Sequence, residues 1–331
     1  IALWVLLAFI PSSLTLGVTT HITTDIAATP MLWAVTLALY LLTFILAFAQ
    51  TGAGLRKAAI IAAPWLAALG LALTMAPLHM ILTELGLHLL VFATVALACH
   101  SKLAASRPNA SHLTGFYLWL SVGGALGGAF NAFLAPVIFD RLLEYPFVLL
   151  AALVLLPVSR TDRNRIVILG ILAAAALSYG QNALVAHITA LTDNRTIALF
   201  VLGTMLFISQ IGNRWLMVGL GLALVFLKVS VSGDVVFSDR DFFGTVTVRE
   251  DNFSYVSPDG TPAAVKIRAL DHGTTRHSVQ LVDGPTPPIP TYYYSPLSPI
   301  AAIIKAVEPS TVIVTGLGAG GLNCFTAPGR H

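Results

Sequence analysis

The chain has 331 residues, of which 56% are hydrophobic and 10% are charged, and its formal net charge is +3. Soluble globular domains contain about 25% charged residues, so this composition excludes an ordinary soluble protein and indicates that most of the chain lies in a lipid bilayer. The few Lys and Arg residues are spread over short loops and form no basic patch in the sequence, so we expect no nucleic-acid partner.

Nine hydrophobic stretches approach the length of about 20 residues that a membrane-spanning helix needs. The sixth of them is marginal in length. They lie at about 1–19, 31–50, 58–77, 80–100, 113–138, 142–158, 166–191, 196–212 and 215–232. The sequence therefore predicts a polytopic, mostly α-helical transmembrane domain over residues 1–232.

Lys and Arg residues gather in every second loop, at 56–57, 102–107, 160–165 and 214. The positive-inside rule makes these loops cytoplasmic. Nine full spans would then place the segment after residue 232 outside the cytoplasm, where a cytosolic nucleotide cofactor could not reach it. We expect eight or nine spans, because either the sixth stretch does not cross fully or the last two form a re-entrant pair.

Glu84 and His88 lie four residues apart in the predicted span 80–100, so they share one helix face. Ionisable side chains inside a membrane are candidates for a functional site, here a polar path for a proton or a substrate. The alternative is that this segment lies near the interface and is simply hydrated.

The run GGALGG, residues 123–128, contains two overlapping GxxxG pairs within the predicted span 113–138. Small residues at this spacing let two helices approach closely in a membrane. We interpret the run as a packing contact inside the bundle. The two cysteines, Cys99 and Cys324, are far apart in sequence, so we expect no disulfide framework and no metal site, and interpret both as small apolar residues.

After residue 232 the sequence becomes polar, rich in turn residues and alternating, which predicts a soluble domain. Period-two alternation at 243–249 and strand-like runs at 253–257, 264–270 and 278–282 predict a small antiparallel sheet within 233–298. In 299–331, helical spacing at 300–307 precedes a predicted buried strand at 311–315, which would open a Rossmann-like α/β domain.

A glycine-rich segment, Gly316-Leu317-Gly318-Ala319-Gly320-Gly321, stands between the predicted strand VIVT and a helical start LNCF. Glycines permit a tight turn and let backbone N–H groups approach a ligand at a helix N-terminus. The spacing satisfies both GxGxG and GxGxxG, which favours a nucleotide or adenosyl-type ligand. A merely structural turn is the alternative.

Both ends of the chain look cut. It opens at Ile1 inside a hydrophobic stretch, without the charged region of a signal peptide. It ends soon after one strand, one turn and half a helix, which cannot close a parallel sheet by themselves. We therefore expect the whole protein to be longer at both ends.

The runs FFGTVTV, ALDHGTTRHSVQ, PTYYYSPLSP and VIVTGLGAGGL, in this order, resemble the membrane-fused spermidine synthase-like proteins of bacteria. In these proteins a multi-helix half precedes an aminopropyltransferase-type domain. The membrane half is similar too, in SSLTLGVTTHITTDIAATPMLW and in HLTGFYLWLSVGGALGGAFNAFLAPVIFDRLLEYP, so the resemblance covers nearly the whole chain. It implies a bacterial inner-membrane protein with a cytosolic, methyltransferase-type C-terminal domain.

The resemblance also implies a ligand and its site. The ligand is an adenosyl sulfonium donor, either S-adenosylmethionine or its decarboxylated form. Gln280 matches the glutamine of the family's LDGxxQ segment, and Tyr293 matches the tyrosine of its YHE motif. Gly316, Gly318 and Gly320 match the family's glycine loop.

Two departures concern the acceptor. The family usually carries Asp within GGGDGG, where this chain has Ala319, and Ser295 stands in place of the YHE glutamate. A polyamine cation needs an acidic pocket, so the loss of these carboxylates weakens the case for a polyamine as acceptor. Asp271 matches the LDGxxQ aspartate only loosely.

The favoured function is transfer of an aminopropyl or related group from the sulfonium donor to a small-molecule amine. The aspartate that would deprotonate the amine belongs to a later strand, beyond His331, so we expect the chain as it stands to be inactive. The alternative is a transporter or permease-like protein. Its path would include Glu84 and His88, and its appended domain would sense a nucleotide-type ligand or be degenerate.

Overall fold

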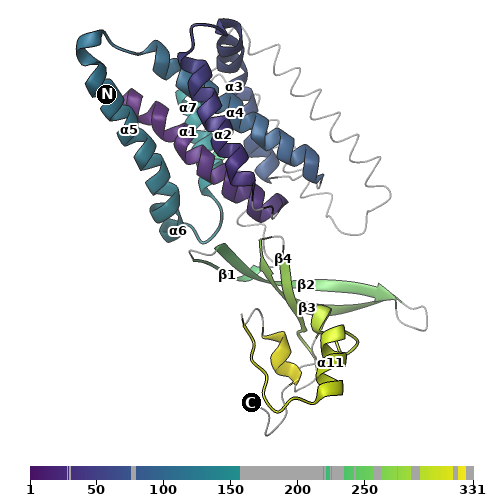
Figure 1. Ribbon diagram of the computed structural model, residues 1–331. Coiled ribbons are helices and arrows are strands. Elements are labelled where there is room, and N and C mark those ends of the chain that lie inside the picture. The colour runs from purple at the N-terminus through teal and green to yellow at the C-terminus, as the bar shows by residue number, and fades with distance from the viewer. Residues whose placement is uncertain are drawn as a thin grey trace. The chain divides into compact units, whose positions relative to one another are not determined.

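The computed structural model forms two compact units, Ile1–Val231 and Ser232–His331, so their boundary lies one residue from the boundary predicted after residue 232 (Figure 1). The structure describes residues 1–27, 29, 31–75, 80–156, 219, 221–223, 225, 235–241, 244–256, 262–273, 275–284, 291–315 and 320–325.

The first unit is helical wherever regular structure is described. Its elements are α1 (Ala2–His21), η1 (Ile22–Ile26), α2 (Leu32–Phe48), α3 (Ala53–Met75), α4 (Ile81–Ala105), η2 (Ala110–His112), α5 (Leu113–Ala129), η3 (Phe130–Leu134), α6 (Ala135–Ile138) and α7 (Glu144–Leu155). Within the described residues, four helical stretches are long and apolar enough to cross a membrane. They are Ala2–Ile26, Ala53–Thr74, Ile81–Ala105 and Ala110–Ile138. The unit is therefore a helical membrane domain.

The prediction of eight or nine spans is not confirmed. The helices α2 and α7 have 17 and 12 residues, fewer than the predicted stretches 31–50 and 142–158. One cause is visible at the end of α7: Leu156 precedes Pro157, and a residue before proline is driven out of the helical conformation. The predicted spans 166–191 and 196–212 and most of 215–232 lie outside the described residues.

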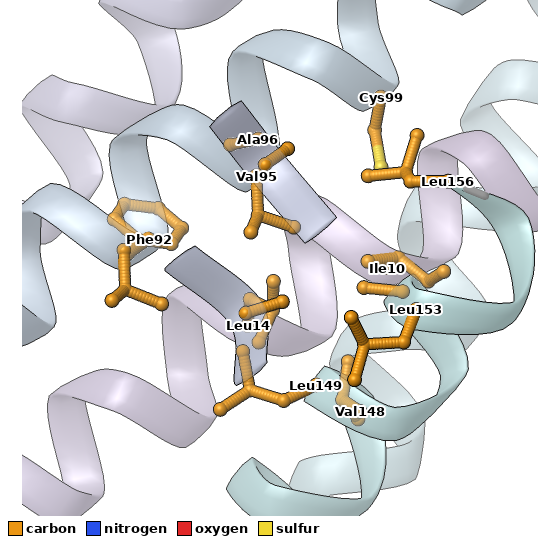
Figure 2. Close-up of a cluster of buried hydrophobic side chains, with 14 of the residues drawn as sticks. Ile10, Leu14, Phe92, Val95, Ala96, Cys99, Val148, Leu149, Leu153 and Leu156 are labelled. Atoms are coloured by element: carbon orange, nitrogen blue, oxygen red, sulfur yellow. The ribbon is translucent and has the colours of Figure 1, made fainter. Parts of the chain in front are cut away.

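The core of this unit is formed mainly by α1, α4 and α7. Figure 2 shows Leu14 of α1, Phe92 and Val95 of α4 and Leu149 of α7 converging on one apolar cluster, and all four side chains are buried. Cys99 lies in the same cluster, as expected of a small apolar residue. This shared core packs α1 directly against α4.

The glycine run of α5 packs on α1. A methyl group added at Gly123 would clash with the backbone carbonyl of Val5, and one added at Gly127 would lie 2.5 Å from the carbonyl oxygen of Phe9. Gly124 and Gly128 have open space at the same position. The predicted packing role is thus confirmed, and it belongs to the Gly123 and Gly127 pair.

The second unit contains a four-stranded antiparallel sheet in the order β1-β2-β3-β4. The strands are β1 (Val235–Asp241), β2 (Gly244–Val256), β3 (Pro262–His272) and β4 (Thr275–Leu281). The predicted antiparallel sheet is confirmed in type. Sequence reasoning missed β1, because its second half, Ser-Asp-Arg-Asp, has no apolar alternation. It also divided β2 in two at Asp251 and Asn252, although both residues pair with β3.

One charged cluster links β2 and β3 on this sheet. Glu250 of β2 is paired with Lys266 of β3 over 2.6 Å and also accepts hydrogen bonds from Arg268. Hydrogen bonds from Lys266 and then from Arg268 hold the pKa of Glu250 below its usual value. Ionised Glu250 therefore stabilises the sheet.

We expect Glu250→Gln to flatten the loss of sheet stability in acid. A carboxyl whose pKa is lowered on folding contributes stability above its unfolded pKa of about 4.3, and this contribution disappears as the pH falls through the folded pKa. Between pH of about 5 and 2 the wild-type sheet should lose more thermal stability than the variant does, measured by its infrared β-sheet band. The exposed Glu308→Gln variant is the control, and an equal acid loss in wild type and Glu250→Gln would contradict the expectation.

The segment after the sheet contains α11 (Pro299–Val307), as predicted. Ser298 caps it by accepting a hydrogen bond from the Ala301 N–H at 3.3 Å, and Pro299 occupies the first turn. The predicted buried strand 311–315 is wrong: these residues form no strand and all are exposed. A buried strand needs paired neighbours on both edges, and no described residue pairs with this segment. The predicted helical start is a 3₁₀ turn, η5 (Gly321–Phe325), so a Rossmann-like fold is not confirmed.

Candidate functional site

The tyrosine run Tyr292–Tyr294, which forms η4, is attached to strand β4. The Thr291 hydroxyl donates a hydrogen bond to the carbonyl oxygen of Val279, the residue before Gln280. Tyr292 adopts a left-handed backbone conformation with φ of 59°, which is uncommon for a bulky residue. Backbone strain of this kind is concentrated at functional sites.

The tyrosine run also touches the glycine-rich segment. The Tyr294 ring lies so close to Gly321 that a Cβ there would be 2.6 Å from ring carbon Cδ2. The neighbouring Gly320 has φ of 72°, a conformation that favours glycine. Gly316 and Gly318 lie outside the described residues. The structure thus brings together the segment after β4, the tyrosine run and the end of the glycine-rich segment.

The two other residues implied by the resemblance lie at the surface. Gln280 is exposed on β4, opposite Arg268 of β3, and Tyr293 is 46% exposed with its ring 4.5 Å from that of Tyr294. Desolvation, followed by the neighbouring Tyr294, raises the pKa of the Tyr293 phenol. Tyr293 therefore stays a neutral hydrogen-bond donor at physiological pH, with an accessible aromatic face.

Asp271 is buried and occupied by ion pairs. Its carboxylate accepts hydrogen bonds of 2.8 and 3.1 Å from Arg276 of β4 and lies 3.8 Å from the Arg249 guanidinium of β2. A bidentate arginine pair fixes the geometry of a carboxylate. Asp271 therefore serves to join three strands, and its charge is already neutralised by arginines.

The membrane unit contains a second group of polar residues. Glu84 and His88 are both buried on α4, so they do share a face that points into the bundle. His88 Nδ1 and the Tyr145 hydroxyl of α7 share a hydrogen bond of 3.0 Å. His21 at the end of α1 completes the group, because its ring centroid lies 4.7 Å from that of His88 and 5.3 Å from that of Tyr145.

One more side chain, the exposed carboxylate of Asp25, belongs to this group through its contact with His21. His21 Nδ1 lies 2.8 Å from the carboxylate of Asp25, which is carried by the π-helical turn η1. We call His21, Asp25, His88 and Tyr145 the polar cluster. Single π-helical turns occur often at functional sites.

Gly17 lies where α1 meets α7, beside the polar cluster. A Cβ on Gly17 would lie 3.4 Å from the Tyr145 Cα and 3.5 Å from Oδ1 of Asn131. Asn131 belongs to the second π-helical turn, η3, and its amide nitrogen donates to the Ser13 hydroxyl at 2.5 Å and to the Gly127 carbonyl at 3.0 Å. Its buried Oδ1 has no hydrogen-bond partner within the part of the chain that the structure describes.

Sequence reasoning found Glu84 and His88 but missed the partners of His88. His21 and Asp25 were detectable, because they show the same four-residue spacing in HITTD. Tyr145 carried no such signal, since its position depends on how α7 packs on α1 and α4. A further buried histidine, His100, bonds Thr43 over 3.2 Å and lies among aromatic rings, as an ordinary core histidine does.

No match to this chain was found among protein-family models, curated proteins or solved structures. Function is therefore inferred from the tyrosine run with the glycine-rich segment, and from the polar cluster. Among the described residues, no group of three or more His, Cys, Asp or Glu side chains could hold a metal ion.

We expect Tyr145→Phe to destabilise the bundle by about 1–2 kcal/mol, because it leaves buried His88 Nδ1 without its partner. The effect is measured as the free energy of unfolding of the detergent-solubilised protein. Tyr117→Phe removes the same hydroxyl from a side chain that is 44% exposed, and it should change stability little. Equal effects of the two substitutions would contradict the expectation.

Proposed function

We propose that the protein is an integral membrane transferase of the spermidine synthase-like kind, which moves an aminopropyl or related group from an adenosyl sulfonium donor to an amine. One observation supports this most directly: Tyr294 packs against Gly321, so the tyrosine run adjoins the glycine-rich segment. The resemblance assigns both segments to one donor pocket. Two of the three adjacent tyrosines, Tyr292 and Tyr293, are about half exposed, so their rings are accessible to a ligand.

The chemistry needs little from the protein beyond position. The amine nitrogen attacks the carbon attached to the sulfonium, the new C–N bond forms as the C–S bond breaks, and the electron pair leaves on sulfur as a neutral thioether. The attacking amine must give up one proton to a base. Because the positive sulfonium is a good leaving group, holding the two reactants in line and removing that proton are the main tasks.

The backbone of Gly316, Gly318 and Gly320 would approach the donor's adenosyl part closely. The accessible face of Tyr293 would lie against the sulfonium, since aromatic rings attract cations. The exposed amide of Gln280 would donate and accept hydrogen bonds in the same pocket.

The acceptor we propose is a small amine with few charges. Ala319 and Ser295 replace the carboxylates that the resemblance would supply. Asp271, which matches the LDGxxQ aspartate loosely, is already neutralised by Arg276 and Arg249. A polyamine with several positive charges would therefore find little compensating charge here.

The donor site is tested by replacing Tyr293. Tyr293→Leu keeps much of the volume of the side chain but removes the aromatic face and hydroxyl, so we expect donor affinity to fall by about tenfold or more. Equilibrium dialysis with labelled S-adenosylmethionine and its decarboxylated form measures this. Tyr117→Leu, on α5 of the membrane unit, is the matched control. Equal affinities of the two variants would refute the proposed role of Tyr293.

We propose a bacterial inner-membrane location with the second unit in the cytosol, where the donor is made. With the Lys- and Arg-rich loops inside, nine full spans would place the second unit outside the cytoplasm, so this orientation requires that fewer than nine stretches cross fully. A topology reporter fused after residue 232 tests it. We expect a cytoplasmic signal, and a periplasmic one would contradict a cytosolic transferase.

A transporter is the second candidate, and the burial of Glu84 and His88 on one face of α4 favours it. In that case the two side chains would line a path, and the second unit would only sense a ligand. Glu84→Gln separates the candidates. Loss of solute uptake with unchanged donor binding would support transport, whereas unchanged uptake would speak against it.

A further inference from the structure

The polar cluster brings together four side chains of the membrane unit that can carry or stabilise a proton. Exposure decreases from 44% at Asp25 to 12% at His21 and 1% at His88 and Tyr145. Asp25 is thus the exposed member of the cluster, and His88 and Tyr145 are its buried members. His21 bonds Asp25 and contacts both rings of the hydrogen-bonded pair His88 and Tyr145.

Buried polar groups are costly in a bilayer, so they are rare there unless they have a function. Here His21, His88 and Tyr145 come from three different helices, α1, α4 and α7. Gly17, one turn before His21, packs against the Tyr145 backbone where α1 meets α7. Packing alone would be satisfied by apolar side chains at these three positions.

The space between the rings limits what the cluster can bind. The three ring centroids lie 4.7, 5.3 and 5.5 Å apart, which are distances of direct ring contact. An organic cation does not fit between rings at these separations. A proton needs no such space.

We propose that the polar cluster is a proton-uptake site, in which His21 binds the proton and Asp25 is its counter-ion. On uptake, neutral His21 gains one proton at its free ring nitrogen and becomes an imidazolium, while Nδ1 keeps its N–H on the Asp25 carboxylate. The charges of the pair then cancel, and no other bond changes. Release reverses the step.

His88 and Tyr145 act as positioning residues. Their mutual hydrogen bond holds the His88 ring edge-on to His21, and the Tyr145 ring lies nearly parallel to the His21 ring, at 24°. The aromatic face of Tyr145 would attract an imidazolium. The carboxylic acids nearest in sequence on these helices are Glu84, one turn before His88 on α4, and Glu144, beside Tyr145 on α7, and both are buried. Farther along, α4 also carries His100 and Lys102.

This inference is independent of the group transfer proposed for the second unit. In the alternative function, transport, the proton would be the coupled ion. The two can fail separately, because protonation of His21 is observed without any donor, amine or transported solute.

The test is nitrogen NMR of the full chain in lipid nanodiscs, with ¹⁵N-labelled histidine. The His21 signal is assigned by its loss in His21→Gln. At a pH of about 6 we expect a large part of His21 to be imidazolium, and we expect Asp25→Asn to reduce that part several-fold, because an opposite charge in contact favours the charged form. Asp25→Glu should restore it.

Asp140→Asn is the matched control, since it removes a carboxylate that is 60% exposed elsewhere in the membrane unit. It should leave the His21 signal unchanged. Tyr145→Phe removes the hydroxyl that bonds His88 Nδ1, so it should alter the ring tautomer of His88. If Tyr145 only filled space, the tautomer would not change. The proposal is overturned if His21 stays neutral down to a pH of about 5, or if Asp25→Asn and Asp140→Asn give the same His21 imidazolium fraction.

Discussion

Replacing Gly123 by alanine is expected to lower the unfolding free energy of the membrane unit by about 2 kcal/mol or more. The added methyl group would meet the backbone carbonyl of Val5 on α1 and would lie 2.9 Å from the Ala8 side chain. A backbone atom cannot rotate away as a flexible side chain can, so α1 and α5 must separate. Unfolding of the purified protein in detergent mixtures measures the change.

The next residue supplies the control. Gly124→Ala makes the same chemical change one position along α5, where nothing lies within 4 Å of the added methyl group. Alanine is the better helix former by about 1 kcal/mol, so Gly124→Ala should leave stability unchanged or raise it slightly. If the two variants have equal stability, the packing of α5 on α1 is not as described.

Gly321→Val is expected to weaken donor binding by about tenfold or more, equivalent to about 1.4 kcal/mol or more. The new side chain would occupy the place of the Tyr294 ring, 2.6 Å from its Cδ2 atom. The ring must then move, and the tyrosine run would separate from the glycine-rich segment. Dialysis with the labelled sulfonium donors measures the affinity.

Tyr294→Phe is the matched control, because it keeps the ring against Gly321 and removes only the hydroxyl. Its donor affinity should stay close to that of the wild type. Combining Gly321→Val with Tyr294→Ala, which vacates the space, should restore part of the lost affinity. Undiminished binding by Gly321→Val would mean that this contact does not shape a donor pocket.

Part of this architecture follows from local sequence patterns. The shared buried face of Glu84 and His88 depends only on helical periodicity, and the close packing at Gly123 depends on a small residue inside a span. The α11 helix has its own cap at Ser298 and a proline in its first turn. In each of these cases, nearby residues suffice to decide the local structure.

Other features depend on contacts between distant segments. His88 bonds Tyr145, 57 residues away, and no spacing rule relates them. The Asp251 and Asn252 positions favour a turn by themselves, yet pairing with β3 keeps them inside one long strand. Conversely, the apolar run at Val312–Val314 has the composition of a strand, but it is exposed and no described residue pairs with it.

The most direct test of the proposed transferase is calorimetry of the purified protein in lipid nanodiscs, titrated with S-adenosylmethionine and with its decarboxylated form. ATP, which shares the adenosine but lacks the sulfonium, is the control ligand. We expect saturable heat from at least one sulfonium donor, with an affinity of about millimolar or tighter, and none from ATP. Absence of heat from both donors, with the Gly321→Val variant indistinguishable from the wild type, would contradict the proposal.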